Sequence, residues 1–168
     1  MARRISIATA ADDGYGMAAA AMLRSVAHHL PAGWSADVFF IDGGLTETTR
    51  GRLEESCGDD LDIYWRRAKP LDSSKVPMWG RLPDLTYQRL MLPELTPRGV
   101  ERVLYLDVDL VVNRNLVELW DESLDGRVLA AVQDLAVPYV SSPLGLRKHR
   151  ELGIPASRTS LFYFLLFL

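Results

Sequence analysis

Residues 103–109, Val103-Leu104-Tyr105-Leu106-Asp107-Val108-Asp109, run from a continuous apolar segment directly into two closely spaced aspartates. Four consecutive apolar residues of this kind are typical of a strand that is buried on both faces, as in a parallel sheet. Asp107 and Asp109 share one side of the chain if the strand geometry persists, because alternate residues of a strand point the same way. We therefore expect two neighbouring carboxylates at the end of a buried strand.

Short strands and helices alternate on either side of this segment. The predicted strands are residues 4–8, 37–41, 61–65, 103–106 and 128–132. The predicted helices are residues 17–30, 46–56 and 86–92, with a helical turn at residues 116–120. We expect Pro93 and Pro97 to close the third helix, because proline cannot continue one. The alternation predicts an α/β fold: a Rossmann-like, mostly parallel sheet with helices on both faces.

The composition argues against several classes of function. The 168 residues suit one domain, and a formal net charge of -3 argues against broad electrostatic binding to nucleic acid. Cys57 is the only cysteine, so no intrachain disulfide or cysteine-based metal cluster is possible, and a cytoplasmic location is expected. The apolar run at residues 161–168 is far shorter than the ~20 residues of a membrane-spanning helix, so no transmembrane segment is predicted.

Four aspartates come directly after predicted strands. In doubly wound sheets, ligands bind beyond the carboxyl ends of the strands, so this coincidence indicates a site. The four residues are Asp12, Asp107, Asp109 and Asp134.

The two aspartates of residues 107–109 suit a divalent cation. Neighbouring carboxylates repel each other unless a cation lies between them, and Mg²⁺ or Mn²⁺ prefers oxygen ligands while keeping positions open for substrate phosphates. The alternative is that a short Asp-X-Asp pattern merely ends a strand. The apolar residues on both sides of the pair favour a functional role.

Two further segments carry side chains suited to a nucleotide. In Asp12-Asp13-Gly14-Tyr15, a carboxylate can accept a hydrogen bond from a base, a tyrosine ring can stack on it, and glycine allows close approach of the backbone. The alternative is that one of the aspartates caps the following helix. Arg89 can fork onto phosphate oxygens, and a surface salt bridge is its competing explanation.

Taken together, these segments resemble glycosyltransferase family 8, a group of retaining GT-A-type enzymes that includes bacterial lipopolysaccharide galactosyl- and glucosyltransferases and glycogenin. Three segments carry the likeness: residues 10–15 (Ala-Ala-Asp-Asp-Gly-Tyr), residues 86–95 with their Tyr-Gln-Arg-Leu core, and residues 103–109. The likeness extends to about Asp134. It implies a GT-A nucleotide-diphospho-sugar transferase fold over residues 1–168.

The resemblance also implies roles for individual residues. Asp12 would hold the uracil and Tyr15 would stack on it. Arg89 would reach the donor sugar or diphosphate, and Asp134 would contact the donor sugar, which makes these two the expected catalytic residues. Asp107 and Asp109 would bind Mn²⁺ or Mg²⁺. The residues expected to line the nucleotide-sugar site are Ala10, Ala11, Asp12, Tyr15, Arg89, Asp107 and Val108.

The reaction implied is transfer of galactose or glucose from a UDP-sugar to a saccharide, lipopolysaccharide or other glycolipid acceptor, with retention and dependent on Mn²⁺. Peripheral contact with the inner face of the membrane is compatible with such an acceptor. Members of the family continue with a phenylalanine-asparagine-small-glycine segment and acceptor-side residues, and a later histidine completes their metal site. Residues 162–168 depart from this pattern, so we expect a chain truncated at its C-terminus and lacking a full metal site.

Two other functions fit parts of the sequence. A haloacid-dehalogenase-type phosphohydrolase also has Asp-x-Asp after an apolar strand, with Asp107 as nucleophile and Asp109 as acid/base. That motif normally opens its domain, however, and three strands precede it here. The other alternative is a non-catalytic fragment that binds a nucleotide without turning it over.

Overall fold

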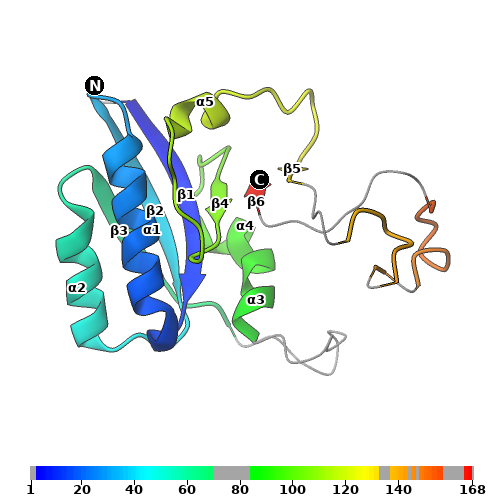
Figure 1. Ribbon diagram of the computed structural model, residues 1–168, viewed down its shortest axis with the longest axis horizontal. Helices are drawn as coiled ribbons and strands as arrows, with labels where there is room; N and C mark the ends of the chain where they lie inside the picture. The colour runs from blue at the N-terminus through cyan, green and yellow to red at the C-terminus, as the bar shows by residue number, and fades with distance from the viewer. Residues whose placement is uncertain are drawn as a thin grey trace. The chain divides into compact units, whose positions relative to one another are not determined.

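The computed structural model describes residues 3–69, 84–132, 137–143, 145–146, 148–156 and 165–167. The chain forms two compact units, Met1–Ser123 and Leu124–Leu168 (Figure 1). Most of the loop expected between residues 66 and 85 lies outside the described residues. No helix in the described ranges is both long and apolar enough to cross a membrane.

A parallel sheet forms the centre of the first unit. Its strands are β1 (Arg3–Ala11), β2 (Trp34–Asp42), β3 (Leu61–Arg66) and β4 (Leu104–Leu106). They lie in the order β3-β2-β1-β4, and every neighbouring pair is parallel. The chain adds β2 and then β3 on one side of β1, and the next crossover returns past β1 to place β4 on its other side. The order confirms the predicted mostly parallel α/β fold.

The two central strands are apolar because both of their faces are covered. On β1, Ile5 and Ile7 are fully buried, and Phe40 on β2 is equally inaccessible. Thr9 is a polar residue of β1 that is fully buried. Its hydroxyl donates to the carbonyl of Leu106 over 2.7 Å, so this side chain adds a bond between β1 and β4 at the end of their pairing.

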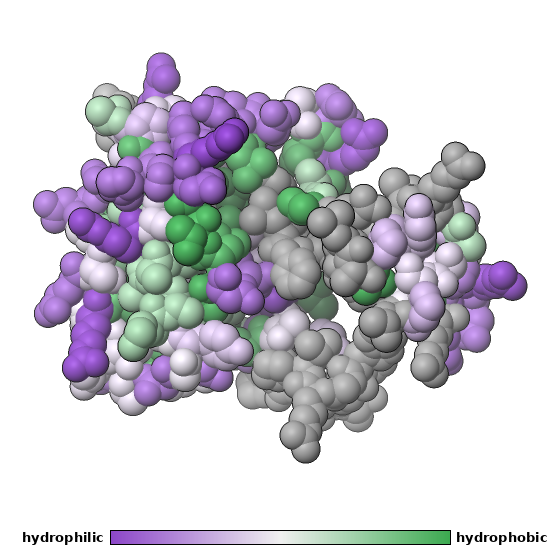
Figure 2. Space-filling model, viewed as in Figure 1, coloured by the Kyte–Doolittle hydropathy of each residue, from purple (hydrophilic) through white to green (hydrophobic). Residues whose placement is uncertain are grey.

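Helices cover both faces of this sheet. On one face, α1 (Gly16–His29) packs against α2 (Glu47–Cys57), and the Trp65 indole N–H donates to Glu54 of α2 over 2.8 Å. On the other face, Arg66 Nε donates to the Leu95 carbonyl of α4 (Leu92–Leu95) over 2.8 Å. Consecutive residues of β3 point to opposite faces, so α2 and α4 lie on opposite sides. The outer face of α2, at the left edge of Figure 2, is mainly polar.

The helix predicted at residues 86–92 is longer and less regular than expected. It consists of α3 (Asp84–Gln88), a 3-10 helix η2 (Arg89–Met91) and α4. The prediction that Pro93 closes this helix is wrong, because Pro93 lies in the first turn of α4. A proline is tolerated there, since the first helical N–H groups have no partner within the helix.

Two smaller elements complete the description. The helix α5 (Leu116–Trp120) lies in the first unit, as predicted, and the Asn115 side chain caps it by accepting from the Val117 N–H. In the second unit, β5 (Ala130–Ala131) pairs antiparallel with β6 (Leu165–Phe167). The predicted strand 128–132 is therefore wrong at both ends, where Val128 and Val132 are 84% and 56% exposed.

Gly16 begins α1 at the point where this helix meets α2. A Cβ atom on Gly16 would lie 2.4 Å from Cγ2 of Thr49. The methyl group cannot rotate away freely, because the Thr49 hydroxyl is held by the carboxylate of Asp13 over 2.6 Å. The absence of a side chain at Gly16 therefore allows the two helices to approach each other.

Replacing Gly16 with alanine should therefore destabilise the chain. We expect Gly16→Ala to lower the free energy of unfolding by about 1–3 kcal/mol, as for other overpacked contacts. Adding Thr49→Ser removes the clashing methyl group, keeps the hydroxyl, and should recover most of the loss. Urea denaturation of the single and double variants measures both effects.

Gly51, inside α2, provides the matched control. A Cβ there meets nothing within 4 Å, so Gly51→Ala should raise the free energy of unfolding by about 0.5–1 kcal/mol through helix propensity. Equal effects at Gly16 and Gly51 would contradict the steric explanation.

Candidate functional site

The ends of β1 and β4 bring the predicted site segments to one edge of the sheet. The two strands are parallel, with Ala8 paired to Tyr105, so both lead out at the same edge. Ala10 and Ala11 end β1, and Asp12 follows them. Asp107 follows the last residue of β4. The loop predicted to hold a nucleotide and the predicted metal-binding aspartates therefore emerge from neighbouring strands.

Asp107 and Arg89 form the central ion pair at this edge. Arg89 Nη2 donates to Asp107 Oδ1 over 3.0 Å, and Nε donates to the carbonyl of Thr86 over 2.9 Å. Side-chain exposure is 23% for Arg89 and 18% for Asp107, so this is not the surface salt bridge considered from the sequence. The guanidinium carbon also lies 4.5 Å from the centroid of the Tyr105 ring, and a ring face attracts such a cation.

Burial sets the electrostatics of this cluster. It raises the pKa of Asp107 above the ordinary carboxyl value; Arg89 opposes this shift and Asp109 adds to it. Burial likewise raises the pKa of the Tyr105 phenol to about 12, so Tyr105 stays protonated at neutral pH. An additional cation near Asp107 would relieve the cost of keeping its carboxylate ionised.

Asp107 and Asp109 do not continue the strand. β4 ends at Leu106, and a turn follows at residues 108–109. The expectation that Asp107 and Asp109 point to the same side required the strand to continue through them, and it does not. Val108 is nearly buried, whereas Asp109 is exposed, and the two carboxylates remain close enough for Asp109 to raise the pKa of Asp107.

Within the described part of the chain, no three His, Cys, Asp or Glu side chains are grouped as a metal cluster. Asp107 and Asp109 still offer oxygen donors of the kind that a hard divalent cation takes, alongside waters and substrate phosphates. A site with two protein ligands would depend on the phosphates of the substrate to complete it.

Hydrogen bonds within the Asp12–Tyr15 loop contribute to its order. Asp12 caps the 3-10 helix η1 (Asp13–Tyr15), and its Oδ1 accepts from the Tyr15 N–H over 3.2 Å. Asp12 therefore does have a capping role, although for η1 and not for α1. Ala11 is buried, and its carbonyl accepts from the Gly43 N–H over 2.9 Å. Tyr15 is 56% exposed, which leaves the residue accessible to a ligand.

Asp134 lies outside the described residues, so its predicted contact with a donor sugar stays a prediction. Two residues that support the geometry of the site were not predicted from the sequence. Tyr105 supports Arg89 from inside an apolar run, and Thr9 ties β1 to β4. Thr9 lies just beyond the predicted strand at residues 4–8, and nothing in the sequence distinguished Tyr105 from a core residue.

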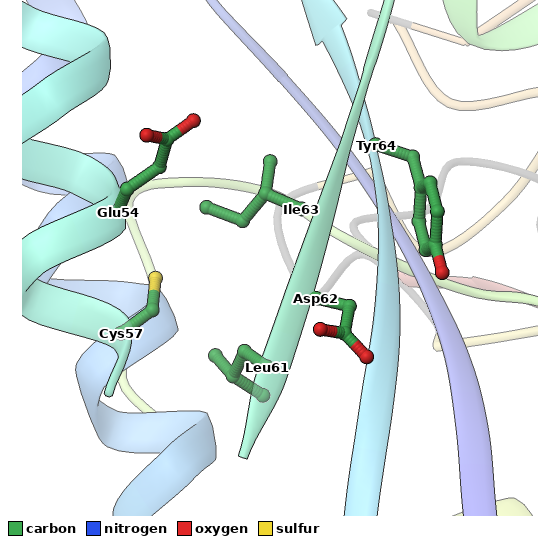
Figure 3. Close-up of a pocket in the computed structure, with 6 residues that line it drawn as sticks. All are labelled: Glu54, Cys57, Leu61, Asp62, Ile63 and Tyr64. Atoms are coloured by element: carbon green, nitrogen blue, oxygen red, sulfur yellow. The ribbon is translucent and has the colours of Figure 1, made fainter. Parts of the chain in front are cut away.

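Two surface pockets lie elsewhere in the first unit. One, of about 250 Å³, lies beside β3 and the end of α2 and is lined by residues including Glu54, Cys57 and Tyr64 (Figure 3). The other, of about 410 Å³, includes Ser6 and Arg102 among its lining residues. None of the predicted site residues lines either pocket, so neither is part of the cluster around Asp107.

Comparison with known proteins identifies the family. The sequence model described as Glycosyl transferase family 8 matches residues 6–153. The chain belongs to this family. Family 8 membership agrees with the resemblance carried by residues 10–15, 86–95 and 103–109, and it favours the transferase interpretation over the phosphohydrolase alternative.

Individual relatives agree with this assignment. The family 8 chain is 25% identical over 130 residues to General stress protein A of Bacillus subtilis (strain 168), covering 76% of this chain and 46% of that protein. It is 43% identical over 47 residues to Probable galacturonosyltransferase-like 4 of Arabidopsis thaliana, covering 28% of this chain and 13% of that one.

Solved structures show the same fold. Galactosyltransferase LgtC, in complex with donor and acceptor sugar analogs, superposes with a TM-score of 0.79 at 26% sequence identity, covering 98% of this chain and 57% of that one. The superposition confirms the GT-A fold. The chain thus spans about half the length of General stress protein A and of LgtC, at 46% and 57%.

The half-buried carboxyl group of Asp107 predicts a pH dependence of stability. Because its pKa is raised on folding, the folded state binds this proton more tightly than the unfolded state. The stabilisation is present below the ordinary pKa of 3.8 and is lost as the pH rises through the raised value. Asp107→Asn removes this titration and keeps an oxygen for Arg89. Its free energy of unfolding relative to wild type should therefore increase between pH 4 and pH 7.

Urea denaturation in metal-free buffer at several pH values measures this difference. Asp59→Asn, at an exposed turn of the same unit, controls for the general loss of one carboxylate. A stability difference for Asp107→Asn that falls with rising pH would contradict the assignment.

Proposed function

We propose that this chain is the donor-binding part of a glycosyltransferase that transfers a hexose, galactose or glucose, from a UDP-sugar with retention of configuration. The observation that carries the proposal is the half-buried Arg89–Asp107 pair, with Asp109 beside it, at the carboxyl edge of a family 8 sheet. A guanidinium and two carboxylates together suit a diphosphate that arrives with a divalent cation.

In the proposed complex, each residue near the edge has one task. Asp12 accepts from the uracil, and the exposed ring of Tyr15 stacks on it. Arg89, held by Thr86 and by the face of Tyr105, directs its guanidinium to the diphosphate or donor sugar. A guanidinium that is in position before the reaction stabilises the negative charge that develops on the departing nucleotide. Asp134 is proposed to contact the donor sugar.

Asp107 and Asp109 are the residues that would hold Mn²⁺ or Mg²⁺. When bound, the ion would neutralise charge on the UDP leaving group. Two features support this assignment: the oxygen-only donor set, and the burial that disfavours an ionised Asp107 without a cation. LgtC was solved with donor and acceptor sugar analogs, which supports a sugar donor for this chain as well.

The proposed acceptor is a saccharide or glycolipid, and contact with the inner face of a membrane is part of the same proposal. The family match at residues 6–153 includes residues of both compact units. This range supports treating residues 1–168 as one nucleotide-sugar-binding domain, the N-terminal portion of the family domain.

Metal-dependent nucleotide binding tests the proposal directly. Calorimetry with UDP and UDP-hexoses should show binding by the wild type that requires Mn²⁺. Asp109→Ala removes one proposed ligand from an exposed position, so it should fold normally and weaken binding at least about tenfold, about 1.4 kcal/mol. Asp59→Ala is the matched control and should bind as the wild type does.

Each outcome discriminates among the functions considered. Binding without turnover would support the non-catalytic nucleotide-binding alternative. Absence of UDP binding by a folded wild type would reject the nucleotide-sugar proposal, and a phosphatase assay would then test Asp107 as a nucleophile.

Stacking by Tyr15 predicts a second binding difference. Removing an aromatic ring from a stacked base costs about 1–3 kcal/mol, so Tyr15→Ala should weaken UDP binding by roughly 5- to 150-fold. Tyr15→Phe keeps the ring and should bind almost normally. Met17, which is 87% exposed nearby in α1, supplies the control: Met17→Ala should leave the affinity unchanged.

A further inference from the structure

The carboxylate of Asp13 joins the Asp12–Tyr15 loop to the first turn of α2. Its Oδ1 accepts from the Thr46 N–H over 2.9 Å, from the Thr46 hydroxyl over 3.0 Å, and from the Thr49 hydroxyl over 2.6 Å. These bonds lower the pKa of Asp13, with the Thr46 N–H making the largest contribution. One oxygen atom of the loop is thus the common acceptor for three donors of the helix.

This arrangement completes a capping box from outside the helix. Thr46 is the N-cap of α2, and its hydroxyl oxygen accepts from the N–H of Thr49 over 3.2 Å. In a capping box, the side chain at the third helical position returns a bond to the N-cap N–H. Here the third residue is Thr49, and the bond is returned by Asp13, 33 positions away from Thr46. A carboxylate at a helix N-terminus also interacts favourably with the helix dipole.

Two other residues of the loop, Asp12 and Tyr15, are those with proposed roles in binding the nucleotide. Asp12 precedes Asp13 and caps η1, and Tyr15 ends η1. At one end of this segment, the Gly43 N–H donates to the Ala11 carbonyl. At the other end, Gly16 packs closely on Thr49. Between these ends, the bonds from α2 to Asp13 fix the course of the loop.

We propose that Asp13 is a positioning residue for the nucleotide, which holds Asp12 and Tyr15 ready for binding by fastening their loop to the N-terminus of α2. The inference rests on the proposed function of this loop. A loop that is ordered before the ligand arrives loses less conformational freedom on binding, so loosening it lowers the affinity without removing any atom that touches the ligand.

Variants of Asp13 separate hydrogen bonding from charge. Asp13→Ala removes the acceptor and should weaken UDP binding about tenfold in calorimetry with Mn²⁺. Asp13→Asn keeps an oxygen that can accept the same three bonds and should stay within about threefold of the wild type. Equal losses for the two variants would show that charge alone matters, and would overturn the inference.

Thr49 supplies a matched pair on the helix side. Thr49→Ser keeps the donor hydroxyl and should bind UDP as the wild type does, whereas Thr49→Val keeps the shape but loses the bond to Asp13 and should bind more weakly. This pair carries the test if Asp13→Ala does not fold. Leu53→Ala, a buried position of α2, should lose stability while the folded protein keeps its UDP affinity.

Hydrogen exchange of the nucleotide-free protein gives a readout that does not depend on UDP. The amides of residues 12–15 should exchange faster in Asp13→Ala than in the wild type, and Asp13→Asn should restore protection. If the folded wild type fails to bind UDP, the proposed function is rejected and this inference falls with it. If the wild type binds and Asp13→Ala binds equally well, the inference alone is rejected.

Discussion

The pairing of β1 with β4 is the contact on which the candidate site depends. These strands are distant in sequence, and their register, with Ala8 opposite Tyr105, sets how far each extends at the shared edge. The Thr9 hydroxyl reinforces the pairing at its last point, through the carbonyl of Leu106. A shift of one residue would turn Thr9 toward the opposite face and separate the loop after β1 from Asp107.

The elements that the sequence predicted well are those whose signal is local. The continuous apolar runs of β2 and β4 and the helices α2 and α5 were predicted from neighbouring residues, and the structure has each of them close to the expected bounds. The family 8 resemblance rests on the same kind of signal, since its three segments are contiguous. Arg89 and Asp107 could be named as site residues for that reason.

What the sequence did not predict depends on contacts between distant residues. That Arg89 pairs with Asp107 above the Tyr105 ring requires α3 and η2 to lie over the end of β4. The turn after Leu106 and the exposure of Val128 depend on packing that periodicity does not encode. The role of Pro93 was predicted wrongly because proline is common both shortly after the end of a helix and in the first turn of one.

The cap that Asp13 provides for α2 joins two segments that sequence alone treats as independent. Homologues should therefore show covariation between position 13 and positions 46 and 49, because a change on one side leaves a donor or an acceptor without its partner. The same coupling constrains protein engineering. A chimaera that receives a new loop at residues 12–15 needs the matching first turn of α2 from the same parent.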